Sequence, residues 1–250
     1  MNQLDPDMVC GYVSENIVYL QEQRIKRLSI LSLGILLAEN PYLFEAKNIT
    51  TANEIILNLL NSLIMSSEVN LFEEFLRGLA VFIAEKTCGG HKSAATGTDL
   101  EFFDQGIHYI VSIKSGPNWG NAAQQNKLEQ DLKNAVSRVK QSKLGVNVQA
   151  VLGICYGKTK TSYVRNYCKV VGKSFWYLIS ENLNLYTDII EPIGYRAKEH
   201  NEAFLFEKGK VINRFTKQFI DEFCDASGAI DWIKLVEFNS GNYMPDNSQP

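Results

Sequence analysis

The chain has 250 residues, of which 45% are hydrophobic and 21% are charged, and its formal net charge is −3. These values are ordinary for a globular protein with one large or two small cores, and they exclude a disordered or fibrous chain. No uninterrupted apolar run approaches the roughly 20 residues that a transmembrane helix needs. The N-terminus also lacks the pattern of a signal peptide, so we expect a cytoplasmic protein that makes no membrane contact.

The first 86 residues predict helices. Apolar residues recur at helical spacing from Met8 to about Glu39, where Asn40-Pro41 ends the pattern. Two further apolar helices are predicted, one from Ile55 to Met65 and one from Leu71 to Glu85. Gly89-Gly90 then breaks the chain before a segment of different character.

Two predicted strands, Gly97 to Phe103 and Ile107 to Gly116, follow this break and are joined by a short turn. Asp99 and Glu101 lie on the first strand, and Ser112 and Lys114 lie on the second. Side chains two residues apart in a strand point to the same face, so each pair is expected to share a face. If the two faces coincide, two acids, a hydroxyl and an amine converge. Such a site could bind Mg²⁺ and activate a water molecule for phosphodiester hydrolysis.

The segment after the second strand continues the alternation of helix and strand. A turn-rich loop leads to a predicted helix from about Ala122 to Ser142, and a buried strand is predicted from Val146 to Tyr156. A basic, turn-rich stretch follows, and the chain reads as helical again from Ser174 to about Phe238. Helix, strand pair, helix and strand in this order predict an α/β core with a mixed sheet.

The net charge of the chain conceals an uneven distribution. Between Ser112 and Lys173 the sequence has eleven Lys and Arg residues but only two acids, Glu129 and Asp131, so this segment carries a charge of +9. A basic segment inside an acidic chain suggests that a polyanion binds there. The other interpretation of its helical lysines is the solvated face of one helix.

Asp99 and the tripeptide Ser112-Ile113-Lys114 resemble the active-site motif of the PD-(D/E)XK nuclease superfamily. The run SIKSGPNWGN and the segment Gly172 to Ser180 resemble type II restriction endonucleases, including those described as PmeII-like. The resemblance implies a restriction-endonuclease-like core with a mixed sheet flanked by helices, plus N-terminal and C-terminal helical elaborations. It also implies Mg²⁺-dependent, sequence-specific hydrolysis of double-stranded DNA by a homodimer, with a cognate methyltransferase in the host.

The same resemblance suggests a division of the chain into three regions. Residues 1–86 would form a helical region for dimerisation or for embracing DNA, residues 87–240 the nuclease core with C-terminal helices, and residues 241–250 a frayed tail. Two alternatives remain open. One is another nuclease of the superfamily that acts in DNA repair or on junctions, and the other is a catalytically inactive DNA-binding module.

The resemblance assigns roles to the motif residues. Asp99 would bind Mg²⁺, Lys114 would orient and acidify the attacking water, and the carbonyl of Ile113 would be a further ligand. Ser112 departs from the family pattern, which usually has a carboxylate there, and a hydroxyl is a poor ligand for Mg²⁺. Three acids could supply the missing carboxylate, and the sequence does not decide among them: Glu101, Glu129 and Glu85.

DNA contacts are expected from two segments. The loop after the second strand and the start of the following helix offer amides and an aromatic ring, and the basic stretch further on offers cations for phosphates. Arg165 with Asn166 is the candidate for reading a base edge. The full set of expected DNA-binding residues is Asn118, Trp119, Asn121, Gln124, Lys158, Lys160, Arg165, Asn166, Lys169 and Lys173.

Overall fold

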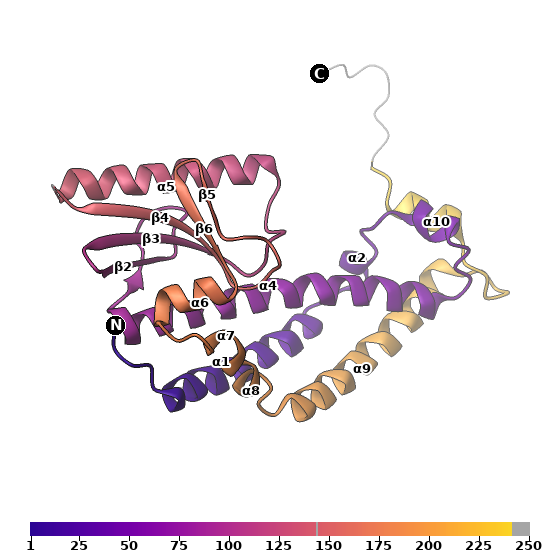
Figure 1. Cartoon of the computed structure of the whole chain (residues 1–250). Coiled ribbons are helices and arrows are strands. Elements are labelled where there is room, and N and C mark those ends of the chain that lie inside the picture. Colours follow the sequence, from indigo (N-terminus) through magenta and orange to yellow (C-terminus); the bar gives the residue numbers. More distant parts are fainter. Residues whose placement is uncertain (144, 242–250) are drawn as a thin grey trace, which may run out of the picture. The chain divides into compact units, whose positions relative to one another are not determined.

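The computed structural model describes residues 1–143 and 145–241, and these form two compact units. The first unit contains residues 1–20 and 70–197, and the second contains residues 21–69 and those from 198 onward. Two helices, α1 (Pro6–Ser29) and α4 (Ala52–Cys88), each contribute to both units (Figure 1). The units therefore do not follow the expected division at residue 86. Residues 242–250 of the expected tail lie outside the described residues.

The first unit is built on a six-stranded mixed sheet with strand order β1-β2-β3-β4-β6-β5. β1 to β3 pair antiparallel, β3, β4 and β6 pair parallel, and β5 pairs antiparallel with β6. The mixed α/β sheet expected from the sequence is confirmed. The strands are β1 (His91–Lys92), β2 (Leu100–Asp104), β3 (Ile107–Lys114), β4 (Asn147–Ile154), β5 (Ser162–Val164) and β6 (Tyr167–Val171).

Helices cover both faces of this sheet (Figure 1). α5 (Ala122–Ser142) connects the parallel strands β3 and β4, as a parallel pair requires, and packs its apolar side chains on one face. The C-terminal part of α4 packs on the other face, where Leu79 and Ile83 contact the cluster that contains Phe102. α6 (Lys173–Ser180), α7 (Leu185–Asp188) and α8 (Ile190–Ile193) complete this unit. Because both faces are covered, β3 is almost entirely buried.

The second unit is helical. Its apolar core includes Ile55, Ile56 and Leu60 of α4 and Phe215 and Phe219 of α9. Besides α4, this unit contains the end of α1, α2 (Leu33–Leu36), α3 (Pro41–Ala46), α9 (Ala197–Phe223) and α10 (Trp232–Phe238).

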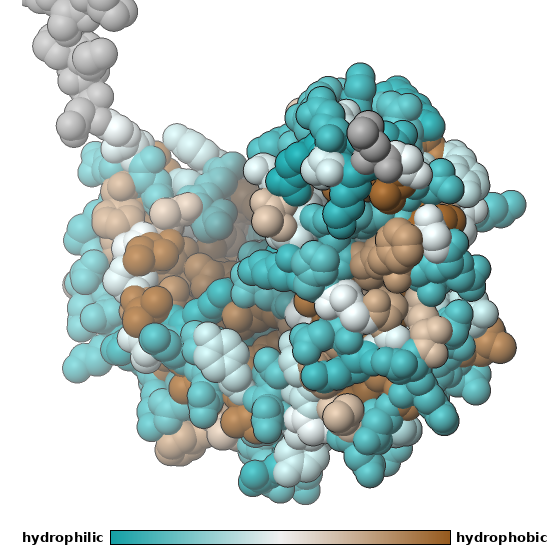
Figure 2. Space-filling view, turned by 90° about the vertical axis from the view of Figure 1, so that its left-hand side faces the viewer, coloured by the Kyte–Doolittle hydropathy of each residue, from teal (hydrophilic) through white to brown (hydrophobic). Residues whose placement is uncertain are grey.

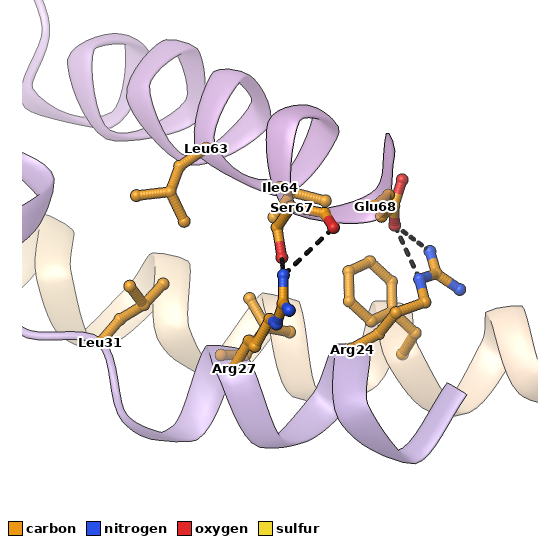
Figure 3. Close-up of a pocket in the computed structure, with 9 residues that line it drawn as sticks. Arg24, Arg27, Leu31, Leu63, Ile64, Ser67 and Glu68 are labelled. Carbon is orange, nitrogen blue, oxygen red and sulfur yellow. Dashed lines mark hydrogen bonds and ion pairs between the residues drawn. The ribbon is translucent and has the colours of Figure 1, made fainter. Parts of the chain in front are cut away.

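Two arginines of α1 fix the packing of α1 against α4 in the second unit (Figure 3). Arg24 Nε donates a hydrogen bond of 2.7 Å to Glu68, and its guanidinium lies 4.0 Å from the ring centroid of Phe204. Arg27 donates to the carbonyl oxygen of Ser67 at 3.1 Å. The charge-assisted bonds stabilise the point where α1 and α4 meet, and the cation–π contact adds Phe204, which lies further along the chain, to the same place.

The observed elements differ from the expected ones at several places. The first helix ends at Ser29 rather than near Glu39. The two helices expected between residues 55 and 85 are one helix, α4, because no Gly or Pro lies between Met65 and Leu71 to interrupt it. β5 and β6 lie in the basic stretch and were not expected, since their residues do not alternate clearly between apolar and polar.

α4 bears on the expectation of no membrane contact. By length and composition, it is long and apolar enough to cross a membrane, with 28% of the relevant window buried. This is weak evidence of a membrane span, because core helices of other proteins meet the same criterion. Several of its apolar side chains, such as Ile55, Leu60, Leu79 and Ile83, are fully buried in the two cores, whereas Met65 is exposed. Hydrophilic side chains cover most of the face in Figure 2 and are interrupted by separate hydrophobic patches.

Gly153 in β4 allows α6 to approach the sheet closely, and this leads to a stability prediction. A Cβ atom at Gly153 would lie 2.3 Å from the ring of Phe175, which is fully buried. We expect Gly153→Ala to lower the free energy of unfolding by about 1–3 kcal/mol through overpacking, measured by urea denaturation. The control is Gly11→Ala in α1, where nothing lies within 4 Å; a gain of up to about 1 kcal/mol is expected there. Equal changes in the two variants would contradict the prediction.

Candidate active site

Asp99 lies directly before β2, and its carboxylate reaches the end of β3. The Asp99 N–H donates to the carbonyl of Val111 at 2.8 Å, so the backbone still pairs with β3 at this point. The Asp99 Oδ2 atom accepts a hydrogen bond of 2.6 Å from the Ile113 N–H. The structure therefore places Asp99 beside the tripeptide Ser112-Ile113-Lys114. In a strand, the N–H and C=O groups of one residue point toward the same neighbouring strand. The carbonyl of Ile113 therefore faces the same side as its N–H, the side of Asp99.

An arginine on α4 lies between Asp99 and a second carboxylate. Arg77 Nε is 3.4 Å from Asp99 Oδ1, and Arg77 Nη2 is 3.4 Å from Glu73 Oε1. Arg77 Nε is buried and has no hydrogen-bond partner among the residues that the structure describes. Neither Glu73 nor Arg77 was expected from the sequence, because a Glu and an Arg four residues apart are also an ordinary surface pair on a helix.

The thiol of Cys155 lies close to the same charges. Burial raises the pKa of Cys155 to about 12, the charges of Glu73 and Asp99 raise it as well, and Arg77 lowers it. The Cys155 N–H donates to the carbonyl of Lys114 at 2.9 Å. Glu73, Arg77 and Asp99 are thus grouped beside the ends of β3 and β4.

Asp99 and Arg77 line a surface cleft of about 430 Å³ in the first unit. Glu85, one of the three acids considered for the metal site, lines the same cleft, but its side chain is more than half exposed and its carboxylate pairs with Lys86 at 3.1 Å. The other residues of the cleft are Tyr12, Glu74, Gly78, Val81, Phe82 and Lys92.

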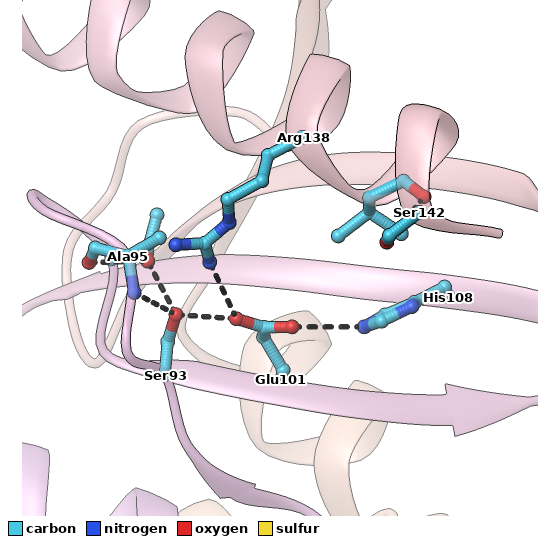
Figure 4. A network of polar contacts seen from close by, with 8 residues as sticks. Ser93, Ala95, Glu101, His108, Arg138 and Ser142 are labelled. Carbon is cyan, nitrogen blue, oxygen red and sulfur yellow. Dashed lines mark hydrogen bonds and ion pairs between the residues drawn. The ribbon is translucent and has the colours of Figure 1, made fainter.

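Glu101 points to the opposite face of the sheet, toward α5 (Figure 4). It accepts a hydrogen bond of 2.6 Å from the Ser93 hydroxyl, and it lies 3.1 Å from His108 Nε2 and 3.7 Å from Arg138 of α5. The expectation that Asp99 and Glu101 share a face is therefore wrong. Asp99 precedes the regular strand, so its side chain does not follow the alternation of β2 and contacts α4 instead.

The surroundings of Glu101 favour its charged form. Burial raises the pKa of Glu101, but the hydrogen bond from Ser93 and the nearby His108 lower it, and the net pKa lies below the ordinary value of 4.5. Ser93 also bonds Thr98 at 2.7 Å, and its N–H donates to the Asp99 carbonyl at 3.0 Å. Glu101 therefore anchors the turn that presents Asp99.

Glu129 is held by two residues that were expected to contact DNA. Arg165 donates to its carboxylate at 2.8 Å, and the Asn166 amide donates at 3.4 Å. The Arg165 side chain is nevertheless 70% exposed, so its guanidinium remains accessible to another partner.

Ser112 and Lys114 lie on the α5 face of β3, whereas the Asp99 carboxylate contacts Arg77 of α4 on the other side of the sheet, so the condition for all four side chains to converge on one face is not met. Ser112 is only 1% exposed, and it is two residues from Ile110, which packs against α5. Lys114 ends β3, and its ammonium lies 5.3 Å from the ring centroid of Trp119. Its backbone adjoins the Ile113 N–H that binds Asp99.

The other expected DNA-binding residues fall into two groups. Asn121 and Gln124 form a capping box at the start of α5, with bonds of 2.9 and 3.0 Å to each other's backbone N–H groups. Their hydrogen bonds are thus part of the helix start. The second group consists of accessible side chains, namely Asn118, Lys158, Lys160 and Lys173, with Lys169 partly buried.

The chemistry of these donors fits Mg²⁺. Within residues 1–143 and 145–241, no group of three or more His, Cys, Asp or Glu residues could hold a metal ion. Mg²⁺ commonly keeps several waters and takes only one or two carboxylates together with substrate phosphates. Asp99, Glu73 and the Ile113 carbonyl offer such a set of hard oxygen ligands. The position of Arg77 indicates that the space between the two carboxylates accepts a positive charge.

Comparison with protein families identifies a family for this chain. The family model of the type II restriction endonuclease EcoO109I matches residues 7–201, which include the whole sheet and the residues around Asp99. No curated protein is similar enough to the chain to count as a match.

The lowered pKa of Glu101 predicts how stability depends on pH. Because its pKa is lower in the folded state, the Glu101 carboxylate stabilises the fold at neutral pH, and this contribution is lost as the pH falls from about 4.5 through the lowered pKa. We expect Glu101→Gln to lower the free energy of unfolding by about 1–3 kcal/mol at pH 7. The difference from the unaltered protein should shrink in denaturation experiments below about pH 4.5. Glu15→Gln, on the exposed side of α1, is the control; a similar loss in that variant would contradict the assignment.

Proposed function

Since the chain belongs to the family of the type II restriction endonuclease EcoO109I, we propose that it is a Mg²⁺-dependent endonuclease that hydrolyses double-stranded DNA at a specific sequence. This proposal rests on one observation: the Asp99 carboxylate accepts a hydrogen bond at the end of β3, from Ile113 of the tripeptide Ser112-Ile113-Lys114. A second carboxylate, Glu73, lies across the shared Arg77. A carboxylate before β2, a second carboxylate on α4, and a carbonyl and a lysine at the end of β3 are the kinds of group that metal-assisted phosphodiester hydrolysis requires.

Each group has a role in this proposal. Asp99, Glu73 and the Ile113 carbonyl hold Mg²⁺, which supplies charge stabilisation at the scissile phosphate and a more acidic water. Lys114 orients the attacking water and stabilises the negative charge that develops on the phosphate oxygens. Its four-carbon stem gives the ammonium the reach that this role needs from the end of β3.

Glu73 replaces the carboxylate that Ser112 lacks. Glu101 faces α5 and Glu129 is bound by Arg165, whereas Glu73 pairs with the same arginine as Asp99. Glu85 is a less suitable acid because it is exposed and pairs with Lys86.

DNA binding involves the basic part of the first unit. Phosphates are contacted by three exposed lysines, Lys158, Lys160 and Lys173. A base edge is read by Arg165 and Asn166, which release Glu129 and bind the base in its place. A palindromic site calls for a two-fold homodimer, to which residues 1–86 contribute. A PmeII-like recognition sequence, a cognate methyltransferase in the host and a cytoplasmic location belong to the same proposal.

The first experiment tests cleavage. We expect the purified protein with Mg²⁺ to cut unmethylated phage DNA into discrete fragments on a gel. EDTA, Asp99→Asn and Lys114→Ala should each reduce the rate by at least about 100-fold, because each removes charge stabilisation from the transition state. The matched control is Asp104→Asn at the other end of β2, which should keep cutting.

Three results would contradict this proposal in different ways. Intact DNA in every lane, together with salt-dependent binding in a gel shift, would favour the catalytically inactive DNA-binding module. Cleavage of junctions without sequence preference would favour a repair or junction-resolving nuclease. Cutting that persists in Asp99→Asn would remove Asp99 from the site.

A second experiment tests which acid completes the site. We expect Glu73→Gln to lower the cleavage rate by at least about 100-fold and to raise the Mg²⁺ concentration for half-maximal rate, because it removes a metal ligand. Glu129→Gln should leave that Mg²⁺ concentration unchanged, since its carboxylate binds Arg165. If only Glu129→Gln, and not Glu73→Gln, changes the Mg²⁺ concentration for half-maximal rate, the acid that completes the metal site is Glu129 on α5.

A further inference from the structure

Three of the acids considered for the metal site each pair with an arginine, but only one of those arginines also contacts Asp99. Arg138 pairs with Glu101 and Arg165 pairs with Glu129. Arg77 instead lies 3.4 Å from both Glu73 and Asp99, so a single guanidinium joins two carboxylates from different elements, α4 and the turn before β2. Its position is the one that a cation shared by these carboxylates would take.

Arg77 is held loosely in this position. Charge-assisted hydrogen bonds are typically about 2.7–2.9 Å long, and both contacts of Arg77 are longer, at 3.4 Å. Its Nε atom is buried without a hydrogen-bond partner in the described part of the chain, although the side chain as a whole is 36% exposed. A guanidinium with a buried, unsatisfied donor gains from moving to better acceptors.

Such acceptors are available in the cleft next to Arg77. Glu74 and Glu85 line this cleft of about 430 Å³ together with Arg77 and Asp99. A divalent cation between Asp99 and Glu73 would repel a guanidinium only a few ångströms away. Besides Arg77, the cleft has the acids Glu74, Glu85 and Asp99 and the one cation Lys92, so it gives the displaced guanidinium a polar place with an excess of acids.

We infer that Arg77 is an internal counter-ion of the metal site, which joins Asp99 to Glu73 until a divalent cation displaces its guanidinium toward Glu74 and Glu85. Arg77 therefore weakens the affinity of the free protein for the metal and prevents the two carboxylates from repelling each other without it. This inference rests on the proposed function, because it requires that Asp99 and Glu73 bind the cation.

The test measures Ca²⁺ binding to the DNA-free protein by isothermal titration calorimetry. Three variants each remove one positive charge next to one candidate acid: Arg77→Met, Arg138→Met and Arg165→Met. We expect Arg77→Met to bind Ca²⁺ roughly tenfold more tightly than the unaltered protein, since a competing charge is removed. The other two variants should remain within about twofold, because the effect of the removed charge falls with distance. Arg77→Lys keeps the charge and should stay close to the unaltered protein.

A second measurement uses the unaltered protein, so its result does not depend on whether Arg77→Met folds. In the unaltered protein, the nuclear magnetic resonance signal of the Arg77 Nε–H group, assigned by its absence in Arg77→Lys, should shift when Ca²⁺ is added. It should not shift in Asp99→Asn. A signal that stays constant while Ca²⁺ binds would overturn the inference.

The outcomes separate this inference from the proposed function. Unchanged or weaker Ca²⁺ binding by Arg77→Met, in a protein that cuts DNA with Mg²⁺, overturns the inference alone. Tighter binding by Arg138→Met or Arg165→Met instead would assign the cation to Glu101 or Glu129 and also overturn it. Equal Ca²⁺ binding by Asp99→Asn and the unaltered protein would remove the proposed metal site itself.

Discussion

The candidate site depends on the unequal lengths of two neighbouring strands. β3 continues to Lys114, whereas β2 begins only at Leu100, so the N–H of Ile113 has no backbone partner on that side. The Asp99 carboxylate takes the place of this missing carbonyl at 2.6 Å. A buried N–H group needs an acceptor, and this need holds the carboxylate at the end of the sheet. The turn before Asp99 is held by Ser93 and Glu101, so the polar network on the α5 face also positions the site.

α4 links this site to the rest of the protein. Its C-terminal part packs on the sheet through Leu79 and Ile83, and this packing places Glu73 and Arg77 beside Asp99. Because Glu73 and Arg77 are one helical turn apart, they lie on the same side of α4 and face the ends of β3 and β4 together. The apolar face that fixes the helix and the polar face that serves the site therefore belong to one element.

Much of the fold could be predicted because local patterns determine it. α5 begins and ends at the expected residues, since Asn121 and Gln124 form its cap and its apolar residues recur every three to four positions. Asp99 and the tripeptide with Lys114 could be proposed as site residues because their spacing in a strand pair is local. Glu73 could not be proposed from the sequence, because only the tertiary packing of α4 distinguishes it from an ordinary surface acid. The sharing of a face by Asp99 and Glu101 was predicted wrongly, because the period of two applies only inside a regular strand.

The burial of Ser112 gives a physical reason for a carboxylate on α4. Ser112 is 1% exposed on the face covered by α5, where a charged side chain without a partner would cost several kcal/mol. The opposite face near Asp99 opens to a cleft of about 430 Å³, and the Glu73 side chain nearby is 26% exposed and contacts Arg77. An acid on α4 avoids the desolvation cost that an acid at position 112 would carry. The difference in burial between the two faces of the sheet therefore explains both the small hydroxyl of Ser112 in β3 and the placement of a glutamate on α4.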